Sequence, residues 1–148
     1  MTKGIALRSQ AAATYALVFL TAIIWIEVRY RLWWHDLNLL LPYALLIVAT
    51  LLSAYAFSGL FNGDPGSPAR AVRLVLVPLA IAATALFSTS TLWLLIGFAV
   101  SGKVSTTKFD LIGALPLIFI REAWFPLLAG LPAATWYLDV RRHRAHRP

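Results

Sequence analysis

The sequence lacks cysteine, and its one methionine is the first residue, so almost no sulfur chemistry is open to the chain. The absence of cysteine excludes disulfides, thiolate metal sites and cysteine nucleophiles. The three histidines are His35, in an expected loop, and His143 and His146, in the C-terminal tail. None lies in an expected membrane span, which argues against a haem held between helix histidines. We expect no cofactor, no metal site and no catalytic group, and therefore favour a protein that is not an enzyme.

Charged residues are scarce as well, at 13% of the 148 residues against about 25% in an ordinary soluble domain. Hydrophobic residues make up 60%, above the usual value of about 45–50%. The apolar runs are too long for the core of so small a chain to cover, which excludes a soluble globular domain. The chain is also too apolar to be disordered and too irregular to be a coiled coil or a collagen.

Four segments are long and apolar enough to cross the hydrocarbon core of a membrane, which takes about 20 residues. They are residues 11–28, 37–57, 74–100 and 111–138. Lys3 and Arg8 precede the first as in a signal peptide, but no small-residue cleavage site follows it, so we expect an uncleaved helix. The turn-forming stretch NGDPGSP separates the second segment from the third. The expected fold is all-α, one domain over residues 1–148 with four transmembrane helices in an up-down bundle.

The fourth segment has two possible forms, because its middle is interrupted by Arg121 and Glu122 and it contains three prolines, Pro116, Pro126 and Pro132. One kinked span is favoured, since neighbouring helices can satisfy the carbonyls that prolines free. The other form is an interfacial or re-entrant piece to about Ile120, followed by a span from about Ala123. That span would have only about 16 apolar residues, which is marginal.

The placement of basic residues predicts that both chain ends are cytoplasmic. With this orientation the inner segments carry Lys3, Arg8, Arg70, Arg73, Arg141, Arg142, Arg144 and Arg147. The outer loops carry fewer, Arg29, Arg31, Lys103 and Lys108. The positive-inside rule therefore favours a multi-pass protein of the cell inner membrane, N-in and C-in, with the lipid bilayer as its first partner.

Arg121 and Glu122 are the most informative residues, because a charge near mid-bilayer costs about 2.5 kcal/mol or more unless it faces protein or water. Consecutive helical residues point about 100° apart, so we expect the two side chains to find different partners rather than each other. In an antiparallel hairpin, Arg121 is expected level with one polar run, Ser88, Thr89, Ser90 and Thr91. This candidate intramembrane polar site either binds an ion, a proton or a lipid headgroup, or holds helices together.

Glu27 precedes Arg31 by four residues, the favourable order for a helical ion pair. We expect this pair at the membrane surface, at the outer end of the first helix; a proton-coupling carboxylate is the alternative reading of Glu27. The adjacent His35 and Asp36 favour a helix cap by Asp36 over a metal or acid–base site.

The C-terminal tail is a dense basic cluster. Anionic cytoplasmic lipid attracts each nearby basic residue by about 1 kcal/mol, so lipid contact is expected for Arg141, Arg142, Arg144 and Arg147. Specific nucleic-acid binding is not expected from so short a stretch.

Small residues at four-residue spacing, Ala129 with Ala133 and Gly130 with Ala134, predict close helix packing within the chain or against a partner. The leading function is a non-catalytic accessory, assembly or scaffold subunit that packs against other membrane helices or against itself. The alternative is a small homo-oligomeric transporter or channel for an anionic or proton-coupled substrate, using Arg121 and Glu122. A lipid-modifying enzyme with Glu27, Asp36 or Glu122 in its site is the third possibility.

Overall fold

The structure is a computed structural model that describes residues 2–30, 40–61, 69–101 and 115–145. Within these ranges every residue except Ala123 is helical, which confirms the all-helical class. The elements are α1 (Thr2–Tyr30), α2 (Leu40–Phe57), the 3-10 helix η2 (Ser58–Phe61), α3 (Ala69–Ser101), α5 (Leu115–Glu122) and α6 (Trp124–Ala145).

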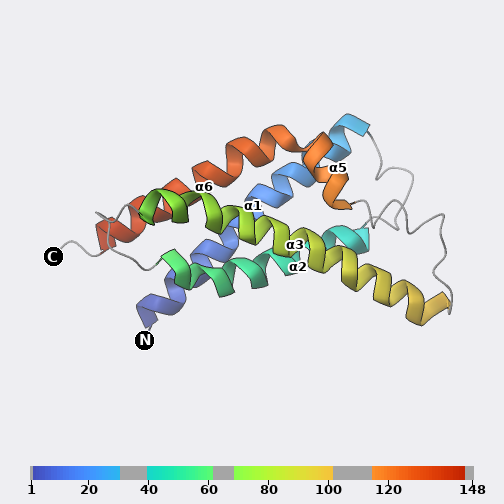
Figure 1. The fold of residues 1–148 in the computed structure, drawn as a ribbon, viewed down its shortest axis with the longest axis horizontal. Coiled ribbons are helices and arrows are strands. Elements are labelled where there is room, and N and C mark those ends of the chain that lie inside the picture. The colour runs from blue at the N-terminus through green and yellow to red at the C-terminus, as the bar shows by residue number, and fades with distance from the viewer. Residues whose placement is uncertain (1, 31–39, 62–68, 102–114, 146–148) are drawn as a thin grey trace.

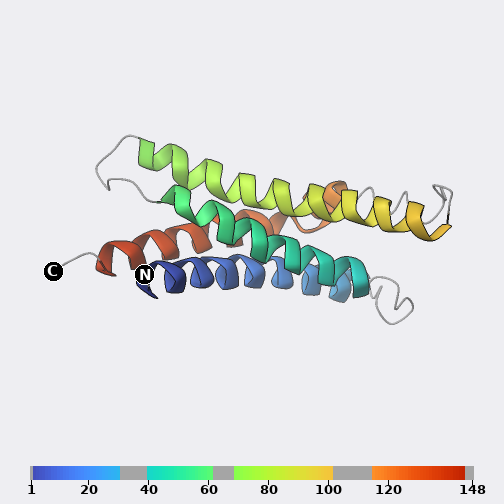
Figure 2. The ribbon, with the colours of Figure 1, turned by 90° about the horizontal axis from the view of Figure 1, so that it is seen from below.

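The helices form an elongated bundle in which α1 and α3 run one way and α2 and α6 run back (Figure 1). The start of α1 and the end of α6 therefore lie at the same end, which we call the terminal end (Figure 2). α2 packs between α1 and α3, while α6 lies mainly against α1. At the opposite end the last turns of α3, yellow in Figure 1, extend past the other helices.

The core lies along the bundle axis and is made of bulky side chains from every long helix. Tyr15 and Phe19 of α1, Leu46 of α2 and Ile81 of α3 are fully buried. Phe119 of α5 joins them, with its ring centroid 6.1 Å from that of Phe19.

The outer surface of the bundle is apolar too. Val28, Leu128 and Phe87 are 74%, 68% and 64% exposed, and many other large apolar side chains also face outward. Water penalises an apolar surface of this extent, whereas hydrocarbon does not. The bundle is therefore apolar both inside and outside, as a membrane protein is.

Three helices are long and apolar enough to cross a membrane, Ile5–Arg29, Leu40–Phe57 and Ala69–Val100. The pair α5 and α6 makes a fourth if it is counted as one broken span. With 33 residues, α3 is about 50 Å long and exceeds the roughly 30 Å of hydrocarbon. These features indicate a membrane protein with three to four spans.

The fourth apolar segment is not the single kinked helix favoured from the sequence, because α5 and α6 meet at a bend of 91°. Ala123 joins them. Its N–H donates to the carbonyl of Phe119 at 3.0 Å, and its own carbonyl accepts from Leu127 N–H at 3.1 Å. Pro126 explains the break: in a continuous helix its ring would clash with the carbonyl of Glu122, whereas in the first turn of a new helix proline is tolerated. The break falls where the alternative reading placed it.

Candidate functional site

Arg121 and Glu122 contact each other, contrary to the expectation that each finds a different partner. Arg121 Nε lies 3.0 Å from Glu122 Oε1. The expectation assumed a continuous helix, but α5 ends at Glu122, where the chain bends away and lets the long arginine side chain reach its neighbour. The Arg121 side chain is 85% exposed, and that of Glu122 only 18%. Arg121 thus stands on the outside of the bundle at the helix break.

The polar run of α3 is divided between two faces of the helix. Thr89 and Ser90 are buried, while Ser88 and Thr91 are exposed. The buried hydroxyls donate to carbonyls one turn earlier, Thr89 to Ala85 at 2.7 Å and Ser90 to Leu86 at 3.0 Å. α3 does pack against α5, and the match in depth between Arg121 and Ser90 stays a prediction.

Glu27 lies inside the bundle and not at its surface, so its expected location is wrong, while its ion pair with Arg31 stays a prediction. Its side chain is 7% exposed and accepts a hydrogen bond from the hydroxyl of Tyr43 in α2. Arg31, its expected partner, and the neighbouring His35 and Asp36 lie outside the described residues. A buried carboxylate held by a tyrosine of the next helix ties α1 to α2.

The basic tail is part of a helix, since α6 continues to Ala145. Arg141 stacks over the ring of Tyr137 at 5.6 Å, and Arg142 Nη2 donates to the carbonyl of Ser58 at 2.8 Å. Arg144 is exposed on the last turns, and Arg147 lies outside the described residues. Contact of these arginines with anionic lipid stays a prediction.

Sequence reasoning missed Asp139, which organises the terminal end. Its carboxylate pairs with Arg70 of α3 and lies 3.4 Å from His143 Nε2, one turn further along α6. The signal was present, because Asp139 is the single acidic residue in a strongly basic C-terminal stretch. What the sequence lacked was the proximity of α3 to α6.

A second polar layer joins α1 to α6 just inside the terminal end. The hydroxyls of Tyr15 and Thr135 are 2.7 Å apart and buried. Nearer the end, Gln10 Nε2 donates to the hydroxyl of Tyr137 at 3.4 Å. These contacts fix how far α1 and α6 slide along each other.

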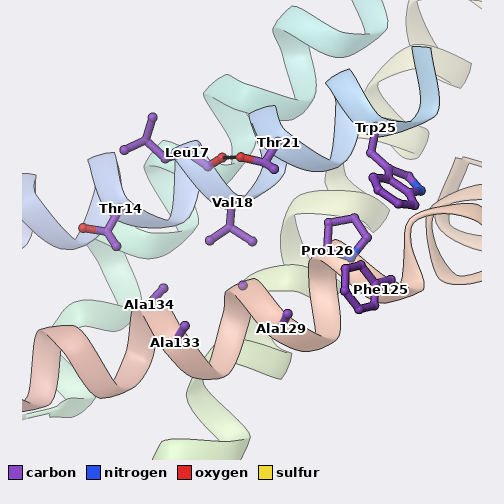
Figure 3. Close-up of a pocket in the computed structure, with 11 residues that line it drawn as sticks. Thr14, Leu17, Val18, Thr21, Trp25, Phe125, Pro126, Ala129, Ala133 and Ala134 are labelled. Atoms are coloured by element: carbon purple, nitrogen blue, oxygen red, sulfur yellow. Dashed lines mark hydrogen bonds between the residues drawn. The ribbon is translucent and has the colours of Figure 1, made fainter. Parts of the chain in front are cut away.

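A groove of about 600 Å³ runs between α1 and α6 (Figure 3). It extends from Thr14 and Ala134 to the rings of Trp25 and Phe125, whose centroids lie 5.8 Å apart. The other lining residues are Leu17, Val18, Thr21, Pro126, Ala129, Gly130 and Ala133. Both threonines donate to carbonyls of their own helix, Thr14 to Gln10 and Thr21 to Leu17, so the groove surface is almost wholly apolar.

The two small-residue pairs of α6 both line the groove but differ in how close they lie to α1. Gly130 and Ala134 face α1: a Cβ on Gly130 would lie 2.8 Å from Val18 Cγ1, and Ala134 is buried. Ala129 and Ala133 are exposed and line the groove (Figure 3). One pair is therefore used within the chain, and the other is left open.

The described residues hold no group of three histidine or acidic side chains that could bind a metal ion. The candidate site is the α1–α6 groove, which Thr14 and Ala134 line at one end. No protein-family model, curated protein or solved structure matches the chain.

Proposed function

We propose that the protein is a non-catalytic accessory subunit of the inner membrane that holds a transmembrane helix of another protein in the α1–α6 groove. In this proposal the chain crosses the membrane four times, with both ends in the cytoplasm. The supporting observation is the groove itself, where Ala129 and Ala133 are exposed one turn apart.

The lining suits a helix because small residues let another backbone approach closely in lipid, where packing contacts drive association. The rim is formed by larger side chains, since Leu17, Trp25 and Phe125 are 62%, 41% and 54% exposed. The threonine hydroxyls already bond to α1, so apolar side chains of a guest helix would meet methyl groups and not unsatisfied donors.

A partner helix fits this shape better than a second copy. Around a two-fold axis the same surface meets itself, so two concave grooves would face each other and leave the space between them unfilled. A head-to-tail arrangement would instead extend into an open chain or a ring. A single foreign helix fills the groove without either consequence.

The experiment fills the groove with the double variant Ala129→Leu, Ala133→Leu. The full chain is affinity-purified from its own membranes, and the bound membrane subunit is quantified per chain. Both positions are exposed on α6, so larger side chains there leave the core intact. We expect the wild-type chain to carry one subunit per copy and the filled variant to retain less than a tenth of it.

The matched control is Ala83→Leu, Ala99→Leu, which adds the same two side chains at exposed positions of α3. The control is expected to retain the subunit in full. Equal loss in both variants, equal retention in both, or a second copy of this chain as the bound species would each overturn the proposal.

The break between α5 and α6 favours transport as the second candidate. Discontinuous helices at membrane depth are typical of transporter binding sites, and exposed Arg121 lies at such a break. In a homo-oligomer this arginine would line a path for an anionic substrate. Anion flux into proteoliposomes that Arg121→Ala and Glu122→Gln abolish would support this candidate, and absence of flux in the wild-type protein would overturn it.

A further inference from the structure

The terminal end of the bundle brings two arginines from opposite ends of the chain to one turn of the backbone. Arg142 Nη2 of α6 donates to the carbonyl of Ser58 at 2.8 Å. Arg8 Nη2 of α1 lies 3.9 Å from the position that a Cβ on Gly59 would occupy. We call Arg8 and Arg142 the η2 arginine pair, because both guanidinium groups lie against η2.

Each guanidinium is held in place by a further contact. Arg8 stacks over the ring of Tyr55 at 5.7 Å, and Arg142 is tied to the Ser58 carbonyl. The two positive charges are close enough to repel each other. Fixed guanidinium groups of this kind form a fork that matches the oxygens of a phosphate group.

Arginines outnumber carboxylates among the described residues of the terminal end. Asp139 is the one acidic side chain among them. Its carboxylate pairs with Arg70, lies 3.4 Å from His143 Nε2 and attracts the guanidinium of Arg142. The loop residue Asp64 lies outside the described residues. The arginines at this end are Arg8, Arg70, Arg73, Arg141, Arg142 and Arg144. With one aspartate they leave an excess of positive charge, which an anion from outside the chain would offset.

The residues around this charge are of the kind found at the level of lipid headgroups. Tyr55 lies beside Arg8 of the pair and Tyr137 beside the neighbouring Arg141, and tyrosines are enriched where hydrocarbon meets water. Towards the middle of the bundle the polar side chains give way to the apolar groove beyond Thr14. Basic pockets between membrane helices at this depth suit acidic phospholipids.

We propose that the η2 arginine pair binds the phosphate of an anionic phospholipid headgroup between α1 and α6. This site is more specific than the general attraction of a basic tail for lipid. It requires two arginines from different helices. Other arginines, which carry the same charge, should therefore contribute far less to the affinity for the lipid.

The test uses the full chain in nanodiscs of phosphatidylcholine with increasing phosphatidylglycerol, and counts bound phosphatidylglycerol by native mass spectrometry. The variants are Arg8→Lys, Arg142→Lys and the double variant, which keep the charge but lose the planar fork. Arg144→Lys is the matched control, because an exposed arginine on the same helix attracts lipid through its charge alone, which lysine keeps. We expect at least a tenfold loss of affinity in the double variant and less than a twofold change in the control.

Lysine keeps the charge, and helicity measured by circular dichroism identifies any variant that fails to fold. If a variant fails to fold, the test is made on the wild-type protein instead. Its affinity for phosphatidylglycerol is compared with its affinity for free glycerol phosphate and for inorganic phosphate. Equal losses in the double variant and the control would overturn the proposal by showing diffuse attraction. Binding of the free phosphates as tight as that of the lipid would overturn it in favour of a soluble anion.

Discussion

Gly130 of α6 packs directly on Val18 of α1, so closely that a Cβ on the glycine would lie 2.8 Å from Val18 Cγ1. This contact brings the two helices together along the floor of the groove. The exposed pair Ala129 and Ala133 can line an open groove only because Gly130 and Ala134 have already set the helix separation.

Replacing Gly130 is expected to push α1 and α6 apart. The variant Gly130→Ala should destabilise the bundle by about 1–3 kcal/mol through overpacking, offset in part by the higher helix propensity of alanine. Unfolding in mixed micelles measures the change. The companion Val18→Ala, Gly130→Ala removes the clashing methyl groups and should recover most of the loss. A double variant as unstable as Gly130→Ala would contradict this packing.

The hydrogen bond between Tyr15 and Thr135 predicts an asymmetry between its two partners. Thr135 donates to the Leu131 carbonyl at 2.7 Å, so it accepts from Tyr15. Tyr15→Phe removes the donor and leaves no other buried donor without an acceptor. It should lower the free energy of unfolding by about 0.5–1.5 kcal/mol. Thr135→Val leaves the buried tyrosine hydroxyl without an acceptor and should cost about 1–3 kcal/mol. Equal losses in the same unfolding assay would show that the bond does not run this way.

Asp139 is expected to contribute more to the stability of the bundle than the exposed Arg144, because its carboxylate pairs with Arg70 and lies 3.4 Å from His143 Nε2. Asp139→Asn should destabilise the bundle by about 1–2 kcal/mol, a value reduced by the partial exposure of Arg70. The control Arg144→Gln changes an exposed residue and should stay within about 0.5 kcal/mol. Raising the salt concentration should narrow the gap between the two variants, and a gap that does not narrow would contradict an ionic origin.

The proposed topology predicts which side of the membrane each connector faces. Because the chain has no cysteine, single substitutions can be labelled without background. Ser9→Cys and Ala145→Cys should react with an impermeant maleimide only from the cytoplasmic side, and Thr107→Cys only from the outside. If α5 and α6 together fail to cross, Ala145→Cys reacts from the outside instead, and the four-span scheme is wrong.

Much of the fold could be predicted from the sequence because lipid imposes a simple length rule on apolar helices. The helices α1, α2 and α3 coincide with the predicted spans 11–28, 37–57 and 74–100. Two of them, α1 and α3, also extend through polar flanks. The fourth segment was ambiguous because Pro126 can either kink a helix or end it. The outcome depends on whether neighbouring side chains support the bend.

The sites were harder to predict, because burial and pairing depend on which helices meet. The sequence around Glu27 indicates a surface position, but the side chain is buried and hydrogen-bonded to Tyr43 of α2. The pairing of Asp139 with Arg70 could not be predicted, because it depends on α3 lying beside α6. The small residues of α6 predicted close packing, but only the structure separates the pair that faces α1 from the pair that stays exposed.

The most direct test of the proposed function places a photo-crosslinking amino acid at position 133, and at position 83 as the control, in the full chain within its native membranes. Position 133 is expected to crosslink to a transmembrane helix of another protein, and position 83 is not. Filling position 129 with leucine should abolish the product. Crosslinks from position 133 to lipid alone, to a second copy of the chain, or in a pattern that position 83 reproduces would contradict the proposed function.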